Sequence, residues 1–128
     1  KVANYFEKKS FKLVFFLGPQ EKLIKVKLMN IFPEAILPEE KVVEFSGPEV
    51  VMATTKFLSC ALANDSGVSH MLSTNYCPII KLFGPKDSDK FTQVSKNIHT
   101  ISSKKYGSNN IDEIQTETVI NKMNNLLS

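Results

Sequence analysis

Residues 59–85, SCALANDSGVSHMLSTNYCPIIKLFGP, decide the fold. Two short apolar runs, 59–63 and 78–83, have the length of strands that are covered on both faces. The small polar residues after the first run are typical of a helix start, so we expect a helix over 66–74. A strand, a helix and a strand in this order favour a βαβ unit with two parallel strands and a right-handed crossover.

The chain on the amino-terminal side of this unit continues the alternation of helices and strands. The run 11–17 is apolar and rich in aromatic residues and valine, which is typical of a buried strand. A second helix begins with an acid, Glu21, in its first turn. The ranges expected on this side are helices at 2–9, 21–30 and 48–53 and strands at 11–17 and 35–37. Residues 38–47 fit a strand, a helix or an irregular excursion.

The carboxyl-terminal side adds a short strand over 98–101 and closes with an amphipathic helix that follows Ile111. Ile120, Met123 and Leu127 form the apolar stripe of that helix. Strands that alternate with helices predict the α/β class, here a Rossmann-like three-layer α/β/α domain with a mostly parallel sheet. Ligands of such sheets bind beyond the carboxyl ends of the strands.

Composition narrows the class of protein. The chain has 128 residues, 42% of them hydrophobic and 23% charged, which fits one domain over residues 1–128 and excludes disorder. All 16 basic side chains are lysines and the net charge is +3, so no guanidinium fork can grip guanine or phosphate. We therefore expect no nucleic-acid partner. No apolar stretch reaches the roughly 20 residues that span a bilayer, which leaves at most peripheral membrane association.

The chain start and the cysteines indicate where such a protein works. The sequence lacks an initiator methionine and a signal peptide and begins inside an expected helix, so we expect a piece of a longer two-domain chain. Cys60 and Cys77 are too few and too far apart for a disulfide framework or a zinc site. We interpret them as reduced, buried thiols of a cytoplasmic protein.

The turn over 63–70, with the sequence ANDSGVSH, carries the chemistry. Asp65 or Ser66 can cap the helix that follows, and Gly67 lets a bulky ligand approach the backbone. Free amides at the helix start would bind a phosphate, and His70, one turn after Ser66, would donate to the same anion. On the residues alone, a well-capped helix with an ordinary, partly buried His70 explains the pattern equally well.

The residues after this turn make the pattern more specific. Asn64-Asp65-Ser66-Gly67-x-x-His70, followed by PIIKLFGPKD over 78–87, resembles the signature of the heptosyltransferase family, glycosyltransferase family 9. That signature is D-[ST]-G-x-x-H, a helix, and then P-x-x-x-L-[FY]-G-P-T-D. The resemblance extends more weakly over nearly the whole chain. It implies the C-terminal, donor-binding domain of a GT-B glycosyltransferase whose N-terminal domain lies outside these 128 residues.

The resemblance also implies a reaction. Members of the family transfer a sugar from a nucleotide sugar such as ADP-heptose to lipopolysaccharide or another glycan, in the bacterial cytoplasm or at the inner face of the inner membrane. The nucleotide sugar is a substrate, so no cofactor and no metal is expected. The general base would lie on the N-terminal domain, so we expect this piece to bind the donor without turning it over.

The site residues are carried over position by position. The donor diphosphate would lie at Asp65, Ser66, Gly67 and His70. Glu21, after the Gly18 turn, would hydrogen-bond the donor ribose, although a glutamate that only favours a helix start is an equal alternative. Lys1 matches the phosphate-contacting lysine of a K-x-W-P motif but lacks the tryptophan and proline.

Departures from the family pattern leave the sugar and the acceptor open. Val68 replaces a proline, and Lys86 replaces the threonine of G-P-T-D. Lys86 fits a place near the donor or acceptor, or a solvated loop. Phe45, in the ambiguous stretch before Pro48, would border the nucleotide base.

Two other classes of protein fit parts of the sequence. A non-catalytic nucleotide-binding or interaction module of the α/β class would share the turn and differ only in what precedes it. A receiver-like signalling domain needs an acidic pair after its first strand, and Gly18-Pro19-Gln20 supplies none.

Overall fold

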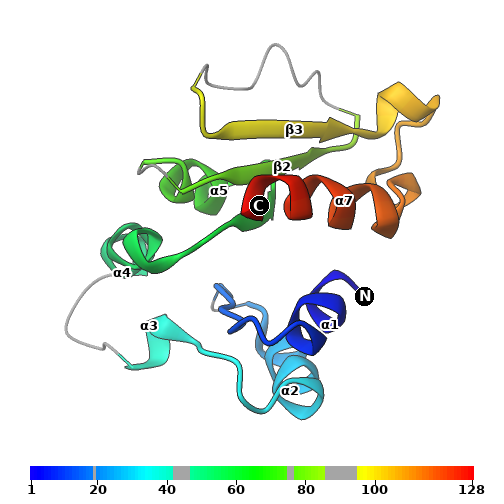
Figure 1. Cartoon of the computed structure of the whole chain (residues 1–128). Helices are drawn as coiled ribbons and strands as arrows, with labels where there is room; N and C mark the ends of the chain where they lie inside the picture. The colour runs from blue at the N-terminus through cyan, green and yellow to red at the C-terminus, as the bar shows by residue number, and fades with distance from the viewer. Residues whose placement is uncertain (19, 42–46, 75–76, 86–94) are drawn as a thin grey trace. The chain divides into compact units, whose positions relative to one another are not determined.

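The computed structural model describes residues 1–18, 20–41, 47–74, 77–85 and 95–128 (Figure 1). The chain divides into two compact units, Lys1–Val51 and Met52–Ser128. We treat each unit by itself below. The prediction of a single domain over residues 1–128 stays a prediction.

The second unit contains an open sheet of three parallel strands in the order β1-β2-β3. Its strands are β1 (Ala61–Asn64), β2 (Ile79–Phe83) and β3 (Ile98–Ser102). Helix α5 (Gly67–Leu72) joins β1 to β2 and contacts both of them. The predicted βαβ unit, the strand over 98–101 and the α/β class are therefore confirmed, with the ends of each element within two residues of the expected ones.

The middle strand explains why this part of the chain forms a sheet. Ile79 and Ile80 are fully enclosed and Phe83 is nearly so, because β2 has a hydrogen-bonded strand on each side and side chains over both faces. Helix α7 (Thr116–Leu127) buries Val119 and Met123. This is the predicted closing helix.

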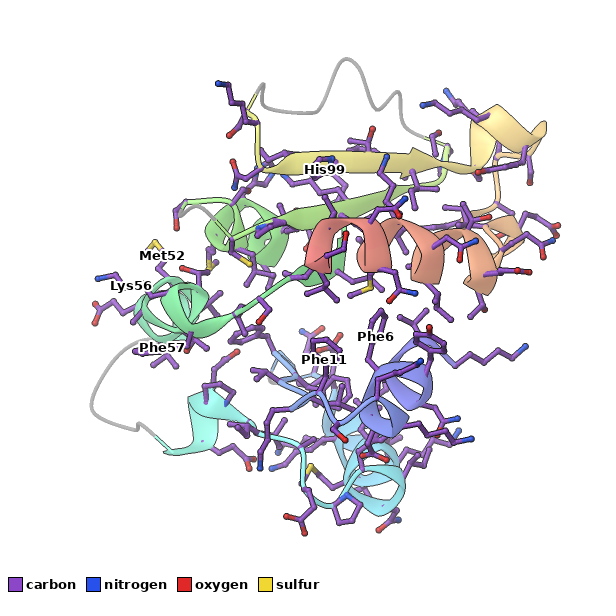
Figure 2. The ribbon with its side chains drawn as sticks, viewed as in Figure 1. Phe6, Phe11, Met52, Lys56, Phe57 and His99 are labelled. Carbon is purple, nitrogen blue, oxygen red and sulfur yellow. The ribbon has the colours of Figure 1, made fainter. Side chains whose placement is uncertain are left out.

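The described part of the second unit also contains three short 3-10 helices, η1 (Thr55–Phe57), η2 (Ser103–Tyr106) and η3 (Ile111–Glu113). Two observations show that helix α7 lies close to β3. Besides burial, the charge of Lys122 on α7 lowers the pKa of His99 on β3, and Leu126 of α7 lines the same hollow as His99. The position of His99 on β3 can be followed in Figure 2.

The first unit is mainly helical. Its helices are α1 (Val2–Lys8), α2 (Lys22–Ile31), α3 (Pro38–Lys41) and α4 (Gly47–Thr54), the last of which crosses the boundary between the units. The rings of Phe6 and Phe11, both labelled in Figure 2, pack edge to face with their centroids 5.5 Å apart. Phe15 and Phe32 form a second ring contact at 5.9 Å.

The strands predicted over 11–17 and 35–37 are wrong as strands. The structure has one parallel bridge, Val14 to Ile36, with hydrogen bonds from Phe15 N–H to the Ile36 carbonyl (3.0 Å) and from Ile36 N–H to the Leu13 carbonyl (2.8 Å). An apolar run becomes a strand only where a neighbouring segment pairs with it over several residues, and the contact here ends after one pair.

Two smaller expectations for the first unit are settled by the helix ends. Glu21 is the residue before α2 and not part of its first turn. Part of the open stretch 38–47 is helical, because α3 begins at Pro38. Residues 42–46 lie outside the described part of the chain.

Candidate functional site

The turn between β1 and α5 is organised by two serines. Ser66 Oγ accepts a hydrogen bond from the Ser69 N–H (3.4 Å), and Ser69 Oγ accepts one from the Ser66 N–H (3.0 Å). This reciprocal pair is a capping box, so Ser66 caps the helix and the alternative cap, Asp65, does not. The N–H groups of Gly67 and Val68, the first two residues of the helix, have no partner inside it.

Asp65 and His70 face each other across this turn. The Asp65 side chain is only 12% exposed, whereas that of His70 is 55% exposed. His70 Nε2 lies 3.9 Å from Asp65 Oδ1, which is an ion-pair distance for a protonated histidine and too long for a hydrogen bond. The Asp65 N–H donates to the Leu82 carbonyl (3.3 Å) and so ties the turn to the end of β2.

Gly67 has no structural reason to be a glycine. A side-chain Cβ built at this position would have no heavy atom within 4 Å, and the backbone φ is not positive. Gly84 differs, because a Cβ there would lie 3.3 Å from the Asn109 carbonyl oxygen. The open space at Gly67 is what a turn that receives a ligand against its backbone would need.

Sequence reasoning overlooked one residue beside this turn, Lys81 of β2. Its side chain is fully buried, and burial lowers the pKa of the ammonium while the carboxylate of Asp65 opposes that shift. A lysine inside the apolar run IIKLF was the available signal, since lysine is almost never fully buried without a partner.

The second predicted group, Gly18 and Glu21, lies in the first unit at the edge of a cavity of about 190 Å³. Glu21 Oε2 accepts a hydrogen bond of 2.7 Å from the Gly18 N–H, so this carboxylate holds the turn that precedes α2. The cavity is lined by Phe15, Leu17, Gly18, Glu21, Lys22, Lys25, Leu37, Glu39 and Glu40. Its walls combine an apolar side with charged groups, as a nucleoside site would.

Acidic side chains set the electrostatics of this cavity. Burial and then repulsion by Glu21 raise the pKa of Glu39 above its ordinary value. Glu40 forms an ion pair with Lys25 on the rim. Three carboxylates and two lysines, Lys22 and Lys25, line the cavity, so it offers both hydrogen-bond acceptors and donors.

The remaining predicted residues divide into described and undescribed ones. Lys1 is exposed, precedes α1, and accepts a backbone hydrogen bond from Tyr5 (3.1 Å) at its carbonyl oxygen. Lys86 and Phe45 lie outside the described residues. The turn 65–70 and the Gly18–Glu21 pair belong to different compact units, so each is described separately.

Outside the two predicted groups, the described residues include two cysteines and a second hollow. Cys60 and Cys77 are free thiols, and burial together with Cys60 raises the pKa of Cys77 to about 11, which leaves it a poor nucleophile. In the described ranges no group of three or more His, Cys, Asp or Glu side chains is arranged to hold a metal ion. A wider hollow of about 910 Å³, beside Pro78 and Asn97, contains none of the predicted site residues.

No helix in the described part of the chain combines the length and the apolarity that crossing a bilayer requires.

The second unit is an α/β unit of Rossmann-like type, in which the turn 65–70 follows the carboxyl end of the parallel strand β1. The chain shares this fold with the glycosyl transferase family 9 protein from Veillonella parvula DSM 2008, with a TM-score of 0.72 and 22% sequence identity. The likeness covers 98% of this chain and 39% of that chain. At this identity it establishes the fold and not the activity. No protein-family model and no curated protein sequence matches the chain.

Proposed function

We propose that this chain is the donor-binding part of a glycosyltransferase of family 9, which takes a nucleotide sugar of the ADP-heptose kind and serves a lipopolysaccharide or other glycan acceptor. The observation that carries the proposal is Gly67, a glycine that neither packing nor backbone conformation requires, between Asp65 and His70. The signature over 64–87 and the fold shared with a family 9 protein support it.

The turn would act on the leaving group of the transfer. As the bond from the anomeric carbon to the diphosphate breaks, negative charge grows on the diphosphate oxygens. The N–H groups of Gly67 and Val68 and the ring of His70 would donate to those oxygens and stabilise the transition state more than the ground state. Ser66 would hold the turn, because its hydroxyl is already bonded to the Ser69 N–H.

The cavity beside Gly18 and Glu21 would receive the nucleoside. The second oxygen of the Glu21 carboxylate would accept a hydrogen bond from a ribose hydroxyl while the first holds Gly18. Lys1, Lys86 and Phe45 remain sequence-based proposals for phosphate, donor and base contacts. Transfer itself would need the general base of an N-terminal domain, so these 128 residues alone would bind and not transfer.

The alternative function is a non-catalytic nucleotide-binding module. It would use the same turn over 65–70 and the same cavity beside Glu21. The chain spans 39% of the family 9 protein that shares its fold. Both functions predict nucleotide binding, but only the glycosyltransferase predicts sugar transfer. An assay of sugar transfer by the chain joined to its upstream sequence would distinguish them. Cytoplasmic location, with at most peripheral contact with the inner membrane, is part of the proposal.

A pair of glycine variants tests the binding site. Gly67→Ala fills the open space, so it should leave the unfolding free energy unchanged or raise it by up to about 1 kcal/mol. The same change should weaken ADP binding by at least about tenfold in calorimetric titration, because the methyl group occupies the place of the ligand. UDP and GDP titrations rank the base.

Gly107→Ala is the matched control, because Gly107 has a φ of +75° in the described structure. Alanine is strained there, so stability should fall by about 1 kcal/mol while ADP affinity stays unchanged. A wild-type chain that binds none of the three nucleotides, or a Gly67→Ala variant that binds like the wild type, contradicts the proposed function.

A further inference from the structure

Lys81, in the middle strand of the sheet, is a buried cation that the proposed function does not use. Its side chain is 0% exposed, and its Nζ has no hydrogen-bond partner among the described residues. An ammonium that is removed from water without a hydrogen bond costs several kcal/mol unless a charge compensates it. A negative charge close to Lys81 would reduce this cost.

The strand register shows where the compensation comes from. Lys81 aligns with Ala63 of β1 and with Thr100 of β3. Side chains alternate between the faces of a sheet, so Asp65, two residues after Ala63, lies on the same face as Lys81. The hydrogen bond from the Asp65 N–H to the Leu82 carbonyl extends the β1–β2 pairing to this residue. The Lys81 side chain therefore lies on the same face as Asp65 and acts on the carboxylate through its charge, since no hydrogen bond joins its Nζ to it.

Electrostatics agree with this placement. Desolvation lowers the pKa of Lys81, and the negative charge of Asp65 is the influence that raises it. Asp65 Oδ1 also lies 3.9 Å from Nε2 of the exposed His70 side chain. The carboxylate is thus near His70 and also acts on the buried Lys81.

An uncompensated carboxylate at this position would work against phosphate binding. It would repel a diphosphate at the amides of Gly67 and Val68, and proteins weaken such repulsion by pairing the charge. A methionine in place of Lys81 would fit the apolar surroundings and remove the desolvation cost, so packing alone does not account for the lysine.

We propose that Lys81 is a positioning residue of the donor site: its buried ammonium neutralises Asp65 from beneath and thereby lets the turn 65–70 accept an anionic diphosphate. The inference rests on the proposed function, because it needs an anion at that turn. Lys81 touches no ligand and acts only through Asp65.

Three variants and a control test this role. Lys81→Met should weaken ADP binding by at least about tenfold, which corresponds to about 1.4 kcal/mol, because Asp65 loses the buried positive charge on its face of the sheet. Adding Asp65→Asn in the same chain should return the affinity to within about threefold of the wild type, because both charges are then gone. Asp65→Asn alone supplies the fourth corner of the double-mutant cycle, and its effect is read from unfolding without ligand. Lys56→Met removes one exposed lysine of the same unit (Figure 2) and should change the affinity by less than about twofold.

Rescue separates charge compensation from a structural role, because a packing defect at Lys81 would persist in the double variant. Lys81→Met that binds like Lys56→Met, or a double variant that stays at least about tenfold weaker than the wild type, overturns the inference. If Lys81→Met does not fold, the ADP affinity of the double variant is the test. A loss of at least about tenfold relative to the wild type then overturns the inference.

Urea unfolding without ligand separates this inference from the proposed function. The four proteins compared are the wild type, Lys81→Met, Asp65→Asn and the double variant. Non-additive losses at Lys81 and Asp65 show that the two charges are coupled whether or not a nucleotide binds. If the two charges are coupled in unfolding but the wild type does not bind ADP, the proposed function is overturned. The Lys81–Asp65 pair then has a structural role only. Additive losses overturn the inference even if ADP binds.

Discussion

In the second unit β2 lies between two hydrogen-bonded strands, whereas in the first unit the apolar run 11–17 meets its neighbour through the single bridge from Val14 to Ile36. Both segments are apolar and of strand length. The difference is the partner: the run 78–83 has a parallel neighbour on each side, and 11–17 does not. Apolar sequence supplies the tendency to be buried, and only pairing over several residues converts it into a strand.

The helices show the same contrast. Helix α7 of the second unit buries Val119 and Met123, but α2 of the first unit buries none of its residues, and its Leu23 is 86% exposed. An exposed apolar helix contributes little to the stability of its own unit. We therefore expect the second unit to be the more stable of the two.

The largest effect should come from truncating a core residue of the middle strand. Ile80 is 0% exposed, so Ile80→Ala should lower the unfolding free energy of the second unit by about 2 to 5 kcal/mol. Leu23→Ala in the first unit removes a leucine that is almost fully exposed, and should change stability by less than about 0.5 kcal/mol. Urea unfolding gives the free energies, and peptide-resolved hydrogen exchange assigns each loss to a unit.

Comparable losses at the two positions would remove the contrast between the units, because they would mean that α2 is packed as tightly as β2. Slower exchange of amides around Val14 than around Ile80 would contradict it in the same way.

A medium effect should come from the cap of α5. This helix has only six residues, so its start depends on the capping box more than a long helix does. Ser66→Ala should cost about 1 kcal/mol in urea unfolding, because the Ser69 N–H loses its acceptor. Gln115→Ala, before α7, is the matched control and should change stability by only a few tenths of a kcal/mol, since Gln115 makes no side-chain cap. Equal losses would show that the α5 cap contributes nothing of its own.

Part of this architecture follows from local chemistry that a sequence displays. The run 78–83, the helix start after the polar turn and the closing helix each satisfy their own pattern, and the structure confirms these elements. Of the expected stripe on the closing helix only Met123 is buried, together with Val119. The choice between Asp65 and Ser66 as the cap could not be made, because both residue types accept backbone hydrogen bonds.

The unpredicted features depend on distant partners. Whether 11–17 becomes a strand depends on how far 35–37 pairs with it, which no local pattern reveals. The role of Lys81 could not be predicted without the register between β1 and β2, because that register places Asp65 and Lys81 on the same face of the sheet. The cavity beside Glu21 likewise needs α3, whose stretch the sequence left open.

The smallest effect concerns charge, where the two units again differ. In the second unit the opposite charges of Lys81 and Asp65 attract each other, whereas in the first unit the like charges of Glu21 and Glu39 repel each other. Burial, and then Glu21, raise the pKa of Glu39 from its ordinary 4.5, so the folded state binds this proton more tightly than the unfolded state. Stability should therefore fall as the pH rises from about 4.5 through the raised value, and the loss should persist at neutral pH.

Glu39→Gln removes that loss, so at about pH 7 the variant should be more stable than the wild type by a few tenths of a kcal/mol, since Glu39 is only half-buried. Below about pH 4 the advantage should disappear, because Glu39 is then protonated in both states of the wild type. Urea unfolding at the two pH values measures the difference, with exposed Glu34→Gln as the control that should show no such change. A Glu39→Gln variant that is less stable at neutral pH would mean that the carboxylate gains more from its contacts than it loses to burial and Glu21. The first unit would then compensate its charges as the second does, and the electrostatic half of the contrast would be gone.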